Sequence, residues 1–375
     1  MRWQQKSLDE AAGLLRSAAL LAPEDEQAPY YLGRVLEDQA QYEDALRKLR
    51  RSVKLQPNFF EAQQQLALLL QRTGDPEGAV AAFRSAIRLQ PENPDMHNNL
   101  GLALLQAGDA LGAIKEFQAA LLLRSDDTIY RGNLGTAYLQ RSDFDAAVIE
   151  FQSALKTAPG DATLHYNLGL ALKLRDQLAE AIAEFQNAEQ LDPSQADVHY
   201  TLGVTLWQQG KFAESVEELR AAIQNRSDYA EAYYTLGTVL KQQGSLQEAA
   251  SALREAIRLQ PGFAGAHTTL AAVLRQLGDS VGADAERKAG ETISKDKTSL
   301  LSATFATNSG KRMLGVGDLD GAIAQFRSAI QSAPAYAPAH YQLGLAMSRK
   351  GKKEEAEQEF KKAAELDPRL TPPSP

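Results

Sequence analysis

The chain of 375 residues contains no cysteine. This absence excludes disulfide scaffolds, thiolate metal sites and cysteine nucleophiles, and it leaves the redox compartment open. No stretch approaches the ~18 consecutive apolar residues of a membrane-spanning helix. The N-terminus interleaves charged with apolar residues, which is unlike a signal peptide and favours a cytoplasmic location. We therefore expect no membrane span.

The sequence also lacks a basic surplus, since its net charge of −8 is spread along the chain. Nucleic-acid binding needs a basic face, so we expect no nucleic-acid partner. Histidine is scarce: the five residues are His97, His165, His199, His267 and His340. Each lies in a different segment of the chain, so none forms the i, i+4 pair of a helical metal site. No phosphate-binding loop, zinc-protease motif or nucleophile elbow occurs, and we expect neither catalysis nor a metal or cofactor.

Proline instead marks a regular interval. Pro23, Pro57 and Pro91 are successively 34 residues apart, and Ser125 and Ser227 keep the same register where proline is missing. Four further columns share this interval. Leu-Gly or Leu-Ala pairs recur as in Leu100-Gly101, followed by alanine as at Ala113, phenylalanine or leucine as at Phe117, and alanine as at Ala120.

This order of Leu-Gly, Ala, Phe and Pro at a 34-residue period resembles the signature of the tetratricopeptide-repeat (TPR) family. The resemblance covers nearly the whole chain. It implies an all-α fold, an α-solenoid of about ten antiparallel helix hairpins that form a right-handed superhelix. Glycine within each hairpin predicts a left-handed residue just past the first helix; these glycines are Gly74, Gly108, Gly210, Gly244, Gly278, Gly317 and Gly351.

We expect a partial repeat with only its second helix over residues 1–25, eight units over 26–297, an insertion at 298–302, two units over 303–370 and a disordered tail at 371–375. The insertion is inferred from the interval between Pro261 and Pro334, which is 73 residues, five more than two repeats. Arg287 also stands where Phe or Leu is expected, and Gly290 stands where Ala is expected. A distorted hairpin with lengthened helices is predicted over about 283–316. Its role stays open: it is a harmless insertion, a hinge or a partner site.

The N-terminal segment matches the end of a first helix and a complete second helix, because residues 3–23 resemble residues 241–261. Leu14, Leu15, Ala18 and Leu21 then lack a full packing partner. Two hypotheses follow. The chain is a fragment of a longer array, or its ends associate through the uncapped N-terminal helix.

The resemblance implies that first helices line a concave groove. The position before each Leu-Gly pair carries Asn99, Asn133 and Asn167, and Thr201 and Thr235 continue it. The position before that carries an aromatic run of Tyr166, Tyr200 and Tyr234. Asparagine both donates and accepts hydrogen bonds, so such a ladder can hold the backbone of an extended peptide. The ladder is similar to that in the TPR arm of O-GlcNAc transferases. A simpler interpretation, that these residues are common in such columns of the family, stays open.

The sequence thus favours a non-catalytic scaffold that binds a protein or extended peptide along a concave superhelical groove. Two alternatives stay open. The chain is the non-catalytic TPR arm of a larger multidomain enzyme, for example a glycosyltransferase, or it is an envelope or pilus assembly factor.

Overall fold

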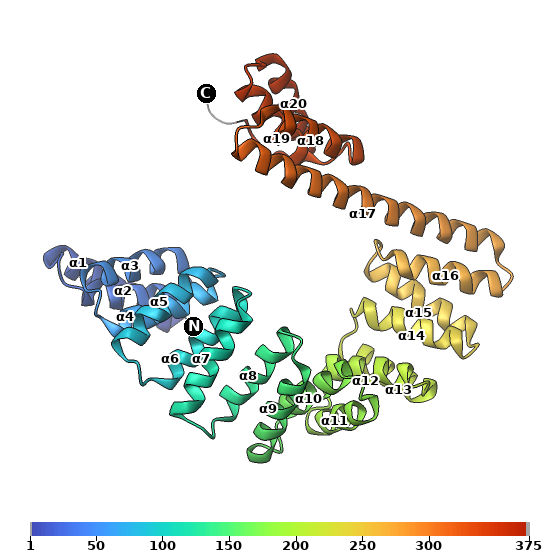
Figure 1. Cartoon of the computed structure of the whole chain (residues 1–375), viewed down its shortest axis with the longest axis horizontal. Helices are drawn as coiled ribbons and strands as arrows, with labels where there is room; N and C mark the ends of the chain where they lie inside the picture. Colours follow the sequence, from blue (N-terminus) through green and yellow to red (C-terminus); the bar gives the residue numbers. More distant parts are fainter. Residues whose placement is uncertain (1, 373–375) are drawn as a thin grey trace. The chain divides into compact units, whose positions relative to one another are not determined.

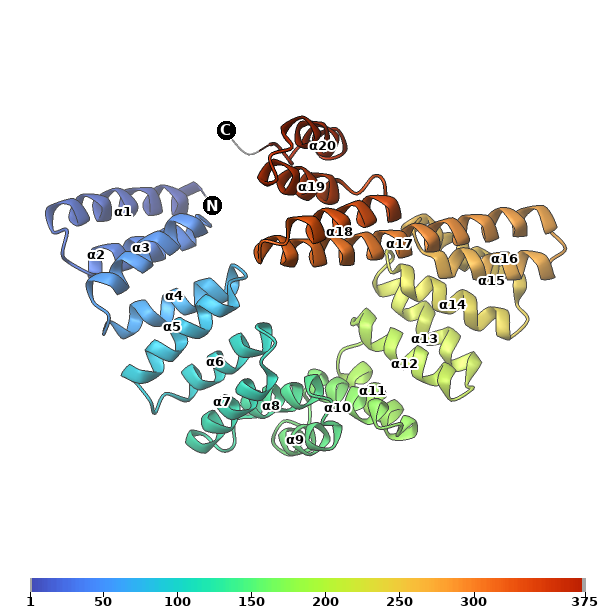
Figure 2. The same ribbon diagram turned by 45° about the horizontal axis from the view of Figure 1, so that its top comes forward.

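The computed structural model describes residues 2–372, with side chains from residue 7 onward. Within these residues the fold is all-α: it has 20 helices and no strand. Residue 1 and the last part of the expected tail, residues 373–375, lie outside the described range. The chain divides after Lys211 into two units. In each unit consecutive helices run antiparallel and form hairpins, as in an α-solenoid (Figures 1 and 2).

The first unit consists of twelve helices. Those with odd numbers are the second helices of their repeats, and those with even numbers are the first helices. Their bounds are α1 Arg2–Leu21, α2 Gln27–Asp38, α3 Tyr42–Leu55, α4 Phe60–Arg72, α5 Pro76–Leu89, α6 Pro94–Gln106, α7 Ala110–Leu123, α8 Thr128–Gln140, α9 Phe144–Thr157, α10 Ala162–Leu174, α11 Leu178–Leu191 and α12 Ala196–Gln208.

The second unit consists of eight helices. Their bounds are α13 Phe212–Asn225, α14 Ala230–Gln242, α15 Leu246–Leu259, α16 Ala264–Gln276, α17 Ser280–Gly315, α18 Leu319–Ser332, α19 Ala337–Arg349 and α20 Lys353–Leu366. Although α17 is longer than a bilayer is thick, no described helix combines such length with the apolar character that crossing a membrane requires.

The core of each repeat depends on the close approach of its two helices. Gly135 on α8 faces Phe151 on α9, and a Cβ atom at Gly135 would lie 2.6 Å from the Phe151 ring. Gly101 with Phe117 and Gly169 with Phe185 repeat this arrangement. The phenylalanine rings are fully buried. The glycine column thus leaves the space that the phenylalanine column fills.

The hairpin turns follow from local backbone chemistry. The seven glycines predicted to end first helices all have positive φ, between 78° and 88°, which confirms their left-handed conformation. Ala40, Ser142 and Asp176 adopt the same conformation in the repeats without glycine. Several second helices then begin with an aspartate cap: Asp75, for example, accepts a hydrogen bond from the Gly78 backbone N–H. Such a cap satisfies an otherwise unpaired donor of the first turn.

The segment over about 283–316 does not form the distorted hairpin that the sequence predicted. Residues 280–315 form the single 36-residue helix α17, instead of two lengthened helices joined by a turn. Its N-terminal part packs on α16 and its C-terminal part on α18. The reason is local: Lys295 stands where proline ends other second helices, and neither proline nor glycine occurs between Gly290 and Gly310. Buried Gly290 lets α17 approach α16, because a Cβ there would lie 3.0 Å from Thr268 Oγ1.

The N-terminal helix leaves part of its apolar surface open. Leu14, Leu20 and Leu21 on α1 are exposed, whereas Leu15 is half-buried against the core of the first unit and Ala12 is buried. Association through this helix stays a prediction.

Candidate functional site

The predicted asparagine ladder lies on three neighbouring first helices of the first unit, α6, α8 and α10. α8 contacts both of the others. Asn133 on α8 donates from Nδ2 to Asn98 Oδ1 on α6 at 2.8 Å. Asn98 is buried and Asn133 half-buried. Asn133 is therefore oriented by the preceding repeat, and its Oδ1 atom and second N–H are not used by this bond.

The two outer members of the ladder are different. Asn99 on α6 and Asn167 on α10 are both half-buried. Within residues 2–372, neither side chain forms a hydrogen bond. A partly buried amide has lost some of its water and gains from a partner that both donates and accepts. The ladder thus offers amide groups in corresponding positions of consecutive repeats.

The aromatic run is only partly accessible. Tyr166 on α10 is half-buried, and its hydroxyl lies 3.2 Å from Thr201 Oγ1 on α12. Its ring packs on Phe185 with centroids 5.7 Å apart. Tyr200 is half-buried as well, but Thr201 is only 9% exposed. Thr201 therefore orients Tyr166 and does not itself offer a surface to a partner.

Two predicted residues belong to the second unit. Tyr234 on α14 packs on Phe263, with ring centroids 4.7 Å apart, and is half-buried. Thr235 is 5% exposed, and its hydroxyl donates to the Glu231 carbonyl oxygen one turn earlier at 2.9 Å. Thr235 is thus satisfied within its own helix, and Tyr234 is the residue of this pair that a partner could contact.

Close to the ladder, the hydroxyl group of Tyr130 on α8 forms hydrogen bonds that connect α8 to α6. Its hydroxyl donates to Asp95 Oδ1 at 2.5 Å and accepts from Arg124 Nη1 at 3.0 Å. Burial, together with the hydrogen bond to Asp95, raises the pKa of Tyr130 to about 12. The neutral hydroxyl is thus held between a carboxylate and a guanidinium, which fixes α8 against α6.

The histidines, which form no metal-binding pair in the sequence, make polar contacts that were not predicted. His97 Nδ1 lies 2.7 Å from Glu116 Oε2, and its Nε2 lies 3.0 Å from the Pro91 carbonyl oxygen. His165, His267 and His340 repeat this arrangement with Glu184, Glu286 and Glu359 and with Pro159, Pro261 and Pro334. Each histidine ties the first helix to the second helix and to the preceding turn. The signal in the sequence was a glutamate 19 residues after each of these histidines.

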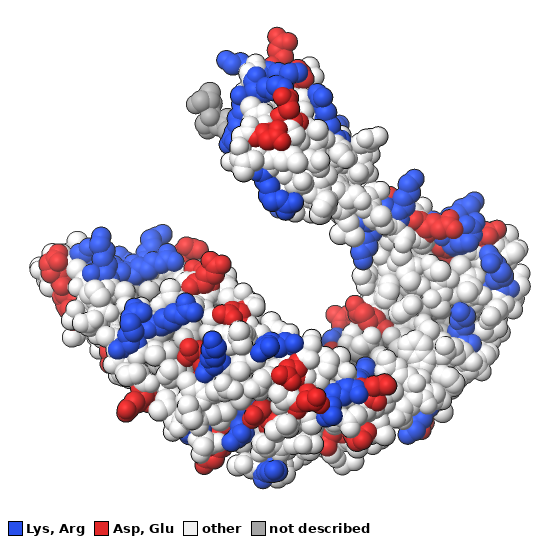
Figure 3. Space-filling model, in the orientation of Figure 1, with Lys and Arg blue, Asp and Glu red and all other residues white. Residues whose placement is uncertain are grey.

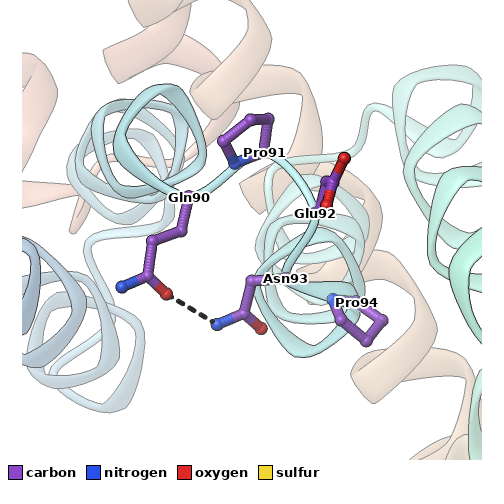
Figure 4. A pocket seen from close by; sticks show the side chains of 5 residues that line it. All are labelled: Gln90, Pro91, Glu92, Asn93 and Pro94. Carbon is purple, nitrogen blue, oxygen red and sulfur yellow. Dashed lines mark hydrogen bonds between the residues drawn. The ribbon is translucent and has the colours of Figure 1, made fainter.

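The turn between α5 and α6 contains a shallow surface hollow of about 550 Å³, lined by Gln90, Pro91, Glu92, Asn93 and Pro94. Figure 4 shows that Gln90 and Asn93 point toward one another, and Asn93 Nδ2 donates to Gln90 Oε1 at 3.3 Å. All five residues are consecutive. The hollow is therefore the outer side of one inter-repeat turn, and it brings no separate side chains together for chemistry.

Comparison with known families decides the identity of the fold. A tetratricopeptide repeat model matches residues 2–62, 65–128 and 200–264, which is about half of the chain. The chain belongs to the tetratricopeptide repeat family. A TPR repeat model also matches residues 171–210, and a further tetratricopeptide repeat model matches residues 313–371. These TPR matches support a protein-interaction scaffold. No curated protein matches the chain.

Solved TPR structures with TM-scores above 0.5 share the fold. A TPR protein from Parabacteroides merdae is 15% identical with a TM-score of 0.53, and the alignment covers 66% of this chain and 98% of that one. The C-terminal part of a TPR repeat-containing protein from Cytophaga hutchinsonii is 14% identical with a TM-score of 0.52, covering 64% and 99%. YrrB, described as a TPR protein with an unusual peptide-binding site, is 24% identical with a TM-score of 0.44, covering 50% and 97%.

Proposed function

We propose that the protein is a non-catalytic scaffold that holds an extended polypeptide segment against the first helices of its repeats. In the first unit the segment contacts Asn99, Asn133 and Asn167, with Tyr166 and Tyr200 beside them. The observation that carries this proposal is that Asn99 and Asn167 are half-buried without a hydrogen-bond partner among the described residues.

The spacing of the helices suits an extended ligand. Packed helices lie about 8–10 Å apart, and an extended chain advances about 3.3 Å per residue. One asparagine would therefore meet the ligand at about every third residue. An amide that binds backbone N–H and C=O groups recognises the extended conformation and not a particular sequence. Tyr166 adds apolar contact area with its hydroxyl already fixed by Thr201.

The expected loss of peptide affinity is large enough to measure directly. Each asparagine contributes roughly 1 kcal/mol net through hydrogen bonding, so losing all three should weaken binding by about 100-fold. Peptides selected by phage display on the purified protein supply the ligand. Their affinity is then measured by fluorescence anisotropy for the wild type and for the triple variant N99A/N133A/N167A.

A matched control is available on the second helices. Gln152 on α9 and Gln186 on α11 are exposed amides that occupy corresponding positions, 34 residues apart. The double variant Q152A/Q186A should bind as the wild type does. If the ladder variant retains full affinity for every selected peptide, the asparagines are packing residues and the proposal is wrong.

A further inference from the structure

The first complete repeat contains a pocket whose lining includes three basic residues, Arg16, Lys48 and Arg51. It lies between α1, the N-terminal part of α2 and α3, and has a volume of about 510 Å³. Its lining residues are Arg16, Ala19, Leu20, Ala22, Pro23, Asp25, Pro29, Leu32, Lys48 and Arg51. It is separate from the ladder, whose helices α6, α8 and α10 contribute nothing to its lining.

The pocket lies where the third repeat has a histidine and a glutamate that this repeat lacks. Two repeat lengths before His97 the chain has Pro29, and two repeat lengths before Glu116 it has Lys48. In the third repeat those two side chains meet at 2.7 Å and close the site. In the first repeat proline is shorter than histidine, and the ammonium group of Lys48 reverses the charge of the glutamate column.

Arg51 takes over one of the missing contacts. Its Nη2 atom donates to the Pro23 carbonyl oxygen at 3.0 Å, which corresponds to the bond between His97 Nε2 and the Pro91 carbonyl oxygen. This bond uses one of the five N–H groups of the guanidinium. Its nearest carboxylate is that of Glu24, 3.8 Å away and 87% exposed. Arg51 is thus fixed at the pocket while much of its donor capacity is unused.

The described residues neutralise only part of the positive charge at the pocket. Lys48 and Arg16 form no ion pair with any described residue. The lining contains one acidic residue, Asp25, whose Oδ1 accepts from the Gln27 backbone N–H. Leu32 and Pro29 are buried and give the pocket an apolar wall, while Leu20 is exposed beside it.

We propose that this pocket binds the carboxylate side chain of a glutamate or aspartate from a partner polypeptide, with a neighbouring apolar side chain against Leu20 and Pro29. The incoming carboxylate occupies the position that Glu116 and its counterparts fill in other repeats. Lys48 and Arg51 supply charge-assisted hydrogen bonds, which are roughly twice as strong as neutral ones. The partner is therefore an acidic segment with interspersed apolar residues.

The surrounding surface favours the approach of such a segment. Figure 3 shows Lys and Arg gathered over α3 and α5 on the face in view. Arg50 and Lys54 on α3 and Arg84 on α5 are exposed and have no ion pair among the described residues. Unpaired charge of one sign attracts an oppositely charged ligand and raises its association rate, in a manner that salt weakens.

The test uses the full chain and a fluorescein-labelled peptide with Glu-Leu pairs separated by Gly and Ser. The same peptide with Gln for Glu is the ligand control. The decisive variant is P29H/K48E, which introduces the histidine and glutamate of the third repeat and should fill the pocket without loss of folding. We expect it to bind the acidic peptide at least about tenfold more weakly than the wild type.

Two further variants distinguish binding in the pocket from non-specific attraction by surface charge. K48A should weaken binding of the acidic peptide by about tenfold. Lys115 on α7 is exposed and lies outside both the pocket lining and this basic surface, so K115A should change affinity by less than about twofold. Equal losses for K48A and K115A, or equal binding of the Glu and Gln peptides, would overturn the proposal. So would binding of phosphatidylserine vesicles with no binding of the acidic peptide, because the surface would then serve a membrane.

The ladder provides an independent check. The variant N99A/N133A/N167A should bind the acidic peptide as the wild type does, and P29H/K48E should keep its affinity for peptides selected on the ladder. If one of the two surfaces does not bind its peptide, the proposal for the other surface can therefore still be tested on its own.

Discussion

Asn133 on α8 donates a hydrogen bond to the side-chain oxygen of Asn98 on α6, so one repeat orients the candidate ligand-binding amide of the next. The hydroxyls of Tyr166 and Thr201 meet in the corresponding positions of α10 and α12. In both pairs the partners are 35 residues apart, one repeat plus one residue. The two columns that the sequence singled out are therefore coupled across the repeat interface.

Replacement of Asn98 by alanine tests this coupling. Because Asn98 is 7% exposed, N98A should remove one hydrogen bond and leave a small cavity, at a cost of about 1 kcal/mol or slightly more in the free energy of unfolding. Urea denaturation followed by circular dichroism measures the loss. N99A removes a side chain that forms no hydrogen bond with the described part of the chain, and its free energy of unfolding should be within about 0.5 kcal/mol of that of the wild type. Equal effects of the two changes would show that the Asn98–Asn133 bond does not stabilise the interface.

The close approach of Gly135 and Phe151 leads to a second prediction. A Cβ at Gly135 would lie 2.6 Å from the ring of a fully buried phenylalanine, so G135A should destabilise the protein by about 1–3 kcal/mol through overpacking. At Gly160, by contrast, no neighbouring atom lies within 4 Å of the position that a Cβ would occupy. G160A should therefore be neutral or slightly stabilising. Thermal unfolding of both variants checks the contrast, and a stable G135A would contradict the assigned packing.

The repeat period was predictable because it depends on sterics local to each hairpin. The glycines at the ends of first helices, Gly74 among them, and the Leu-Gly column mark backbone conformations and close contacts that few other residues allow. These features specify helices, turns and packing faces without reference to distant parts of the chain.

The accessibility of the candidate site was harder to predict. Thr201 and Thr235 share a column with the asparagines, yet both are buried, because access depends on what the next repeat places against them. The histidine contacts were missed for a similar reason. Each requires a glutamate on the following helix and a carbonyl group in the preceding turn, so no single position in the sequence shows it.

The hydrogen bond between Tyr130 and Asp95 predicts a stability change at high pH. Burial and this hydrogen bond raise the pKa of Tyr130 from 10 to about 12 in the folded protein. The folded state thus holds the phenolic proton more tightly than the unfolded state does. The resulting stabilisation is complete below about pH 10 and is lost as the pH rises toward 12.

The change D95N should lower the pKa of Tyr130 toward its ordinary value, because it removes the negative charge that opposes ionisation. Difference absorbance titration of tyrosinate, with Y130F subtracted, isolates this one tyrosine. The midpoint should move to lower pH in D95N. A midpoint that does not move would mean that Asp95 does not influence the hydroxyl and that burial alone accounts for the shift.

The continuity of α17 gives the last prediction, because the structure and the repeat pattern disagree at this point. Lys295 stands where proline ends the second helix in other repeats, but here it lies inside an unbroken helix and is exposed. K295P would remove the backbone N–H that bonds to residue 291 and would place the proline ring against that carbonyl group. The expected cost is about 3 kcal/mol, with a fall in helical content. K295A keeps the backbone hydrogen bond and should leave both the free energy of unfolding and the helical content unchanged. If K295P is as stable as K295A, a turn already separates the two halves of residues 280–315, as the proline register suggests, and α17 is not one helix.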